Sequence, residues 1–288
     1  MDPFNFHVPH WNSGCYTDKK APIKCARPFC LVHEIKRERA VLCCHGFTGF
    51  PGELAKIALD LYEAGFDVFV PRYSGHGTSK EDFLQSKASD WLGTADNAMR
   101  SLQQTYSSVY LVGHSMGGLI ALILSARYGV KRMSLYAPAL FLLPEDYSAE
   151  GLKALGLLGT LEPKPLNIQE GFEGICERDE GDTRYLEENY CSYNAYTQVY
   201  ELLLLKEKAK SLVPSLFCDT LTMCGLCDET VDPFVAQYIT EHGKGHNKAL
   251  LIPQSGHLLP YEKNQAAQDE ANNATVDWLS KTETRSCI

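Results

Sequence analysis

Ser115 stands between two glycines in the segment 109–123, which reads VYLVGHSMGGLIALI. Gly113, Ser115 and Gly117 form the pattern Gly-x-Ser-x-Gly. A short apolar run that predicts a strand precedes the pattern, and apolar residues at helical spacing follow it. At such a strand-to-helix turn, glycines relieve the crowding around a strained, exposed serine that acts as a nucleophile. The pattern predicts nucleophilic chemistry at Ser115; the alternative is a tight turn with an incidental serine.

Two later residues could activate this serine. A serine hydroxyl becomes a good nucleophile only when a base removes its proton and a third group orients that base. His257 is the predicted base, because it lies on a Ser-Gly turn directly after a late apolar segment. Asp228 is the predicted acid, because it comes soonest after the preceding strand-like segment; Glu229 and Asp232 are close alternatives. The chain order serine, acid, histidine is the order expected for an α/β-hydrolase.

Acyl transfer also requires hydrogen-bond donors directed at the developing oxyanion, and backbone N–H groups can serve without reorganising. Met116 supplies one candidate N–H, since it directly follows the serine. Phe47 supplies the second, in the loop HGFTGFP after an early strand-like segment. Gly46 in this loop allows the backbone to approach closely.

Short strand-like segments alternate with helical patterns along the chain. The predicted strands cover 30–35, 41–44, 67–70, 109–112, 133–136, 221–224 and 249–252. The predicted helices cover about 54–61, 88–104, 119–128, 193–210 and 264–279. This alternation predicts an α/β fold with a mostly parallel twisted sheet and helices on both faces.

One interval is too long for this alternation. Roughly eighty residues separate positions 138 and 221, whereas a complete βαβ unit needs about 30. We therefore expect a core of residues 1–139 and 192–288, with residues 140–191 inserted as a small cap.

The start of the cap is rich in apolar side chains. They could line an acyl pocket above the serine or form the cap's own packing; the candidates for the pocket are Leu140, Phe141, Leu142 and Leu143.

Composition excludes several classes of function. The net charge of −9 argues against nucleic acid as a partner. No apolar run approaches the ~20 residues needed to span a bilayer, so we expect no integral membrane segment. The start of the chain shows no secretory leader, and the 11 cysteines are expected to be free thiols, which together predict a cytoplasmic protein.

Five segments carry a resemblance to a known family. They are HGFTGFP, PRYSGHGTS, GHSMGG, GLCDETVDP and QSGHLLP, in this order. In this combination the chain resembles the small bacterial carboxylesterase and monoacylglycerol lipase group of the α/β-hydrolase family. The resemblance implies a catalytic triad of Ser115, Asp228 and His257. It also implies an oxyanion hole formed by the backbone N–H groups of Phe47 and Met116.

The predicted function is that of a serine carboxylic-ester hydrolase working through an acyl-enzyme. Its expected partner is a small-molecule ester with a short- to medium-chain acyl group, monoacylglycerols included. No metal and no organic cofactor is required. The alternatives are a thioesterase or acyl transferase with the same triad, or a catalytically silent binding protein on the same fold. The pattern predicts nothing about the number of subunits.

Overall fold

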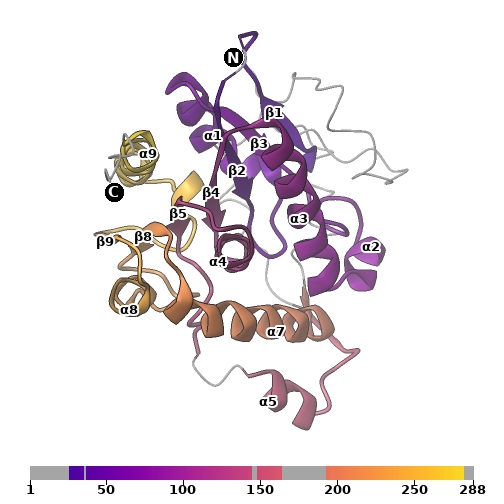
Figure 1. Cartoon of the computed structure of the whole chain (residues 1–288). Coiled ribbons are helices and arrows are strands. Elements are labelled where there is room, and N and C mark those ends of the chain that lie inside the picture. Colours follow the sequence, from indigo (N-terminus) through magenta and orange to yellow (C-terminus); the bar gives the residue numbers. More distant parts are fainter. Residues whose placement is uncertain (1–25, 36, 145–147, 164–192, 282–288) are drawn as a thin grey trace.

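The computed structural model describes residues 26–35, 37–144, 148–163 and 193–281. A seven-stranded sheet forms its centre, in the order β1-β3-β2-β4-β5-β8-β9 (Figure 1). Its strands are β1 Phe29–Leu31, β2 Arg39–Cys44, β3 Asp67–Val70, β4 Ser108–His114, β5 Arg132–Tyr136, β8 Asp219–Gly225 and β9 Asn247–Ile252. β1 pairs antiparallel with β3, and the other neighbouring strands pair in parallel. The predicted mostly parallel sheet is therefore confirmed.

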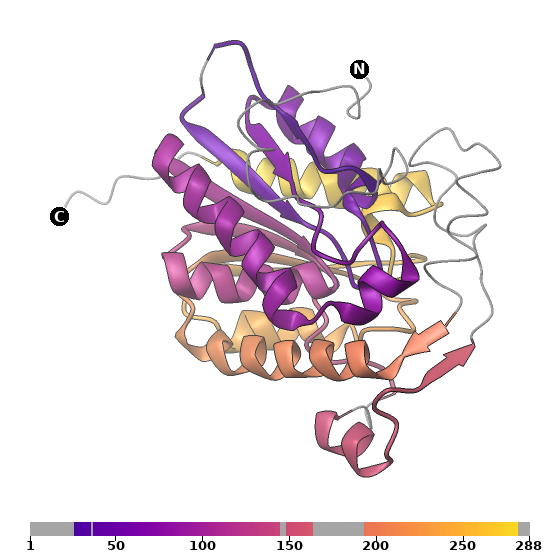
Figure 2. The ribbon, with the colours of Figure 1, turned by 90° about the vertical axis from the view of Figure 1, so that its right-hand side faces the viewer.

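Helices cover both faces of this sheet (Figures 1 and 2). Apolar side chains of α1 and α9 pack on one face, while those of α3, α4 and α8 pack on the other. The helix bounds are α1 Ala55–Glu63, α2 Lys80–Gln85, α3 Ala88–Thr105, α4 Met116–Tyr128, α5 Ala149–Ala154, α7 Tyr196–Leu212, α8 Phe234–His242 and α9 Gln265–Ser280. The described residues also form the short 3₁₀ helices η3 Pro51–Leu54, η5 Val213–Ser215 and η6 Leu259–Tyr261. Among the helices of the described residues, none is long and apolar enough to cross a membrane.

The first strand is shorter than predicted. The pattern predicts a strand over 30–35, but β1 ends at Leu31. Beyond it, both the backbone N–H and the ring Nδ1 of His33 lie within 2.9 Å of Asp67 Oδ1. This side-chain carboxylate takes the place of a strand partner, so the chain leaves the sheet edge.

The predicted helix over 193–210 also begins later than expected. Tyr193–Ala195 form the strand β7, which pairs antiparallel with β6, Leu161–Pro163, and α7 starts at Tyr196. Figure 2 shows this pair and α5 at one end of the molecule, beyond α7. Residues 164–192 lie outside the described residues, so the division into a core and a cap over 140–191 stays a prediction.

Ser115 occupies a strained turn between β4 and α4. Its φ of 53° and ψ of −116° lie outside the conformations that side chains ordinarily favour. The turn also brings α4 against the end of β2: a Cβ at Gly117 would lie 1.9 Å from the carbonyl oxygen of Cys44. A Cβ at Gly113 would lie 2.5 Å from the carbonyl oxygen of Gly117. Glycine is therefore required at both positions flanking the serine.

Gly93, inside α3, differs from these two glycines. A Cβ at Gly93 would meet no heavy atom within 4 Å. A glycine inside a helix costs about 0.5–1 kcal/mol relative to alanine, because it loses more backbone freedom on folding. Packing therefore does not require Gly93.

Gly117 of α4 and Gly93 of α3 are expected to respond in opposite directions to substitution by alanine. Gly117→Ala is expected to lower the free energy of unfolding by at least about 3 kcal/mol, because backbone atoms must move. Gly93→Ala is expected to raise it by about 0.5–1 kcal/mol. Urea unfolding followed by circular dichroism measures both. Effects of the same sign in the two variants would contradict this account of the turn.

Candidate active site

The structure brings Ser115, His257 and Asp228 into one chain of hydrogen bonds. His257 Nε2 lies 3.0 Å from Ser115 Oγ, and His257 Nδ1 lies 2.8 Å from Asp228 Oδ2. The three residues follow β4, β9 and β8, whose carboxyl ends meet at one edge of the parallel sheet. In this geometry the imidazole can accept the hydroxyl proton at Nε2 while Nδ1–H donates to the carboxylate.

Asp228 is held as a buried carboxylate. Its Oδ1 accepts the backbone N–H groups of Thr230 at 2.8 Å and Val231 at 2.9 Å, which leaves Oδ2 for His257. Burial would raise the pKa of Asp228. The hydrogen bond and charge of His257, together with the two N–H donors, outweigh burial and lower this pKa below its ordinary value. The carboxylate therefore remains ionised and can stabilise a protonated His257.

The two alternative acids lie elsewhere. Glu229 is exposed on the loop after β8. Asp232 Oδ1 accepts the backbone N–H of Phe234 at 2.9 Å, at the start of α8. The structure thus brings Asp228, and neither of these neighbours, to the imidazole.

The two candidate oxyanion donors lie at the start of α4 and on the loop after β2. Met116 is the first residue of α4, directly after the serine, and is fully buried. Phe47 follows β2 by three residues, and the end of β2 lies against Gly117. The Phe47 ring packs edge-on against Phe83 and Trp91, with centroids 5.5 and 5.6 Å away. These contacts anchor the residue whose N–H is the second candidate.

A buried glutamate connects this loop to the histidine. Glu53 Oε2 accepts the backbone N–H of Gly46 at 3.2 Å and lies 3.7 Å from His114 Nδ1. On its other side, His114 Nε2 donates to the carbonyl oxygen of His257 at 3.0 Å. The loop of the oxyanion candidate thus hydrogen-bonds to this carboxylate, and the loop of the predicted base reaches it through His114, whose Nδ1 lies close to Glu53 without a hydrogen bond. Sequence analysis missed Glu53, because one glutamate beside a proline and a glycine carries no pattern that predicts burial.

Two further histidines near the site are neutral and structural. His45 Nδ1 donates to the carbonyl oxygen of Gly46 at 3.0 Å, and its Nε2 accepts the backbone N–H of Tyr73 at 3.4 Å. Burial, with the nearby His76, lowers the pKa of His45 well below its ordinary value. Burial likewise lowers the pKa of His76 to about 3. Both rings pack among aromatic side chains and take no part in the triad.

The described cysteines are free thiols, and Cys224 and Cys227 form no bridge. Burial raises the pKa of the Cys224 thiol to about 12. Within the described ranges, no three His, Cys, Asp or Glu side chains are grouped to hold a metal ion. The segment 224–227, which reads CGLC, is thus part of β8 and the turn that follows it.

A cavity of about 200 Å³ lies against the loop after β2 and the loop after β8. Phe47 and Leu143 line it, together with Thr230, whose backbone N–H binds Asp228. Tyr193 from β7 and Leu202 from α7 form another part of its wall.

The four predicted pocket residues of the cap separate into two pairs. Leu142 and Leu143 line this cavity, and the Leu143 N–H donates to the carbonyl oxygen of Thr230 at 2.9 Å. Leu140 and Phe141 do not line it. Leu140 is 1% exposed and belongs to the core beside the sheet. The Phe141 ring packs on α8, 5.0 Å from the ring of Tyr238, so neither residue of this second pair lies on the wall of the small cavity, and their role in an acyl pocket stays a prediction.

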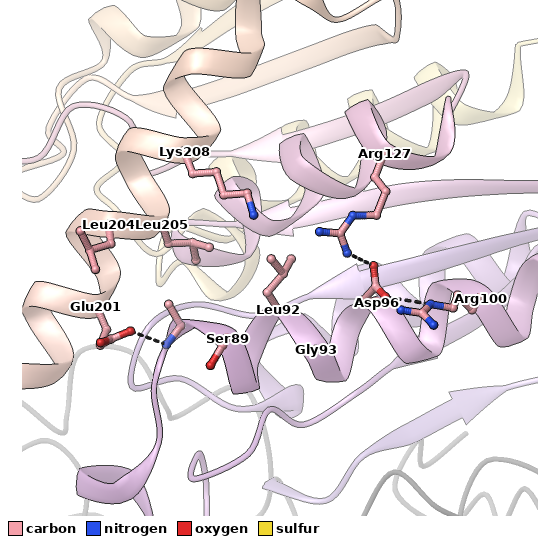
Figure 3. Close-up of a pocket in the computed structure, with 11 residues that line it drawn as sticks. Ser89, Leu92, Gly93, Asp96, Arg100, Arg127, Glu201, Leu204, Leu205 and Lys208 are labelled. Carbon is pink, nitrogen blue, oxygen red and sulfur yellow. Dashed lines mark hydrogen bonds and ion pairs between the residues drawn. The ribbon is translucent and has the colours of Figure 1, made fainter.

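A larger cavity, of about 440 Å³, lies between α3, α4 and α7 (Figure 3). None of the three triad residues lines either cavity. The smaller cavity is lined by Phe47, a candidate oxyanion donor, and by Thr230, whose backbone N–H binds Asp228, so we assign the chemistry to the smaller cavity.

Comparison with known proteins identifies relatives of this chain. A thermostable monoacylglycerol lipase of Bacillus sp. (strain H-257) is 35% identical over 88 residues, 31% of this chain and 35% of the relative. A carboxylesterase of Bacillus subtilis (strain 168) is 27% identical over 116 residues, 40% of this chain and 47% of the relative. The chain thus spans about a third to a half of the length of these two relatives. A serine hydrolase BPHL of Mus musculus is 26% identical over 253 residues, 84% of this chain and 79% of the relative.

Solved structures share the fold. A structure from a study of the metagenome-derived lipolytic enzymes LipS and LipT matches with a TM-score of 0.72 and 23% identity, covering 88% of this chain and 97% of the other. The monoacylglycerol lipase of Paleococcus ferrophilus matches with a TM-score of 0.66 and 18% identity, covering 88% of this chain and 98% of the other.

The family model described as "Serine aminopeptidase, S33" matches residues 35–264. Since this match spans most of the 288 residues, the chain belongs to the S33 serine aminopeptidase family of α/β-hydrolases.

Proposed function

We propose that this protein is a serine carboxylic-ester hydrolase acting on short- to medium-chain acyl esters, monoacylglycerols included. The observation that carries the proposal is the unbroken hydrogen-bond chain from Ser115 Oγ through His257 to Asp228. Relatives named monoacylglycerol lipase and carboxylesterase support the choice of an oxygen ester as substrate.

The proposed reaction proceeds through an acyl-enzyme. Ser115 Oγ attacks the ester carbonyl while His257 Nε2 takes the hydroxyl proton, and Asp228 stabilises the imidazolium that forms. The N–H groups of Phe47 and Met116 stabilise the oxyanion. Collapse of the tetrahedral intermediate expels the alcohol, which takes its proton from His257. Water then attacks the acyl-serine in the same way, releasing the carboxylic acid and restoring the serine hydroxyl.

The small cavity is the proposed acyl site. Its volume of about 200 Å³ lies below the ~300–1,000 Å³ typical of ligand pockets, which favours a short acyl group. Aromatic and aliphatic side chains dominate its wall, so each added methylene that fits contributes up to ~0.8 kcal/mol to binding.

We also propose that the protein works in the cytoplasm. The described cysteines are free, and free thiols persist in a reducing compartment.

Ser115→Ala tests the nucleophile. We expect the wild type to be labelled by a fluorophosphonate probe and to hydrolyse p-nitrophenyl butyrate, and we expect the variant to lose labelling and at least about 10⁴ in kcat. Circular dichroism should show an unchanged fold. Turnover of the variant near the wild-type rate would refute the assignment. Absence of wild-type labelling would instead indicate a silent binding protein, and faster turnover of an acyl-CoA than of the ester would indicate a thioesterase.

Asp228→Asn tests the acid. The substitution keeps the shape but removes the charge that stabilises the imidazolium, so we expect kcat to fall by up to about 10⁴, as in serine proteases. Glu229→Gln and Asp232→Asn are matched controls on the same loop, and each should change kcat less than about threefold. Steady-state kinetics on one ester compares the three variants. A larger loss in either control than in Asp228→Asn would transfer the role of the acid to that neighbour.

The acyl cavity predicts a chain-length dependence that specific side chains control. Wild-type kcat/KM should rise from acetyl to butyryl esters, by up to about 0.8 kcal/mol or fourfold per methylene, and stop rising when the cavity is full. Changing Leu142 and Leu143 together to serine should flatten this rise. Leu155→Ser is the control, because Leu155 is 72% exposed on the cap and lines neither cavity. A folded double variant with the wild-type profile would remove both leucines from the acyl site.

A further inference from the structure

The cavity between α3, α4 and α7 combines an apolar wall with a cluster of cations. Leu92 from α3 and Leu204 and Leu205 from α7 supply apolar side chains. Arg127 from α4 and Lys208 from α7 supply positive charge (Figure 3). Its volume of about 440 Å³ lies within the range of small-molecule sites.

Asp96 fixes one side of this cation cluster. It accepts hydrogen bonds from Arg100 Nε and the Tyr128 hydroxyl, both at 2.9 Å, and from Arg127 Nη1. Burial would raise the pKa of Asp96, but these hydrogen bonds and the charge of Arg127 outweigh burial and lower it below its ordinary value. One carboxylate thus holds two guanidinium groups, which leaves an excess of positive charge and sets the orientation of Arg127.

Lys208 adds a third cation to the wall of the cavity, beside Arg100 and Arg127. Within the described part of the chain, its ammonium group has no ionic partner. Figure 3 shows the Lys208 side chain extending from α7 toward Arg127 on α4. Glu201 lines the cavity as well, but its carboxylate accepts the backbone N–H of Ala88 at 3.1 Å, at the start of α3. Two facing cations repel each other, and an anion bound between them would remove this repulsion.

Gly93 is an independent sign that the cavity is kept open. It lies on the cavity wall, in the interior of α3, where a Cβ would meet no atom. Alanine there would stabilise the helix by about 0.5–1 kcal/mol without a steric conflict inside the protein. The glycine therefore has no role in packing, and its effect is to leave room beside Leu92.

We propose that this cavity is a binding site for a single-chain alkyl carboxylate. The carboxylate lies between Lys208 and Arg127, where the planar guanidinium still has N–H donors directed away from Asp96. The alkyl chain lies along Gly93 and the leucines of α3 and α7. This site is separate from the acyl cavity, and its existence does not depend on the proposed hydrolysis.

Calorimetric titration of decanoate tests the proposal. The protein is the full-length Ser115→Ala variant, with 1-decanol as the uncharged ligand of equal chain length. We expect decanoate to bind at least tenfold more tightly than decanol, and its affinity to fall as salt is raised from 50 to 500 mM. Equal affinities for the two ligands would overturn the proposal.

Variants in the same background locate the site. Lys208→Gln should weaken decanoate binding at least tenfold, whereas Lys206→Gln, a neighbouring lysine on α7 that does not line the cavity, should leave it unchanged. Gly93→Leu should abolish binding with α-helical circular dichroism retained. Decanoate affinity that is insensitive to Lys208→Gln, or that is lost instead on changing Leu142 and Leu143 to serine, would overturn the proposal by placing the ligand elsewhere. Neither result bears on Ser115 labelling, so the two proposals fail independently.

Discussion

The active site depends on the contact between two backbones, at Gly117 of α4 and Cys44 at the end of β2. Only a glycine permits this approach, and the approach in turn requires the tight turn at Ser115. A non-glycine residue at positive φ costs about 1–3 kcal/mol. The surroundings maintain it: the Ser115 N–H donates to the carbonyl oxygen of Tyr136 at 2.9 Å, and residues 116–125 of α4 are all buried. Burial of this helix stabilises the strained nucleophile.

The parallel sheet then determines which side chains can reach that turn. Neighbouring parallel strands end at one edge of the sheet, so the loops that follow them meet there. Asp228 thus reaches His257, 29 residues away in the sequence, and His257 reaches Ser115, 142 residues away. Asp228 and His257 also form hydrogen bonds to groups outside the triad. Backbone N–H groups hold Asp228, and His114 holds the backbone of His257. Such anchoring restricts the side chains to the geometry that proton transfer requires.

Much of this arrangement follows from sequence patterns, and the exceptions have physical causes. The strand over 67–70 has the predicted bounds, because three consecutive buried apolar residues follow Asp67 and form a clear strand pattern. β1 ends early because the side-chain carboxylate of Asp67, in place of a strand partner, accepts the backbone N–H of His33. Phe141 is as apolar as Leu142, but only tertiary structure decides that it faces α8 instead of the cavity. Burial of a charged residue such as Glu53 arises from partners distant in sequence, which no local pattern contains.

The link through Glu53 and His114 has a consequence for thermal motion. The loop after β2 and the loop after β9 share this carboxylate, and Tyr261 adds a contact at 3.5 Å from the second loop to Glu53. We therefore expect a displacement of one loop to be coupled to a displacement of the other. Such coupling would limit changes in the separation between His257 and the Phe47 N–H when both loops move relative to the sheet.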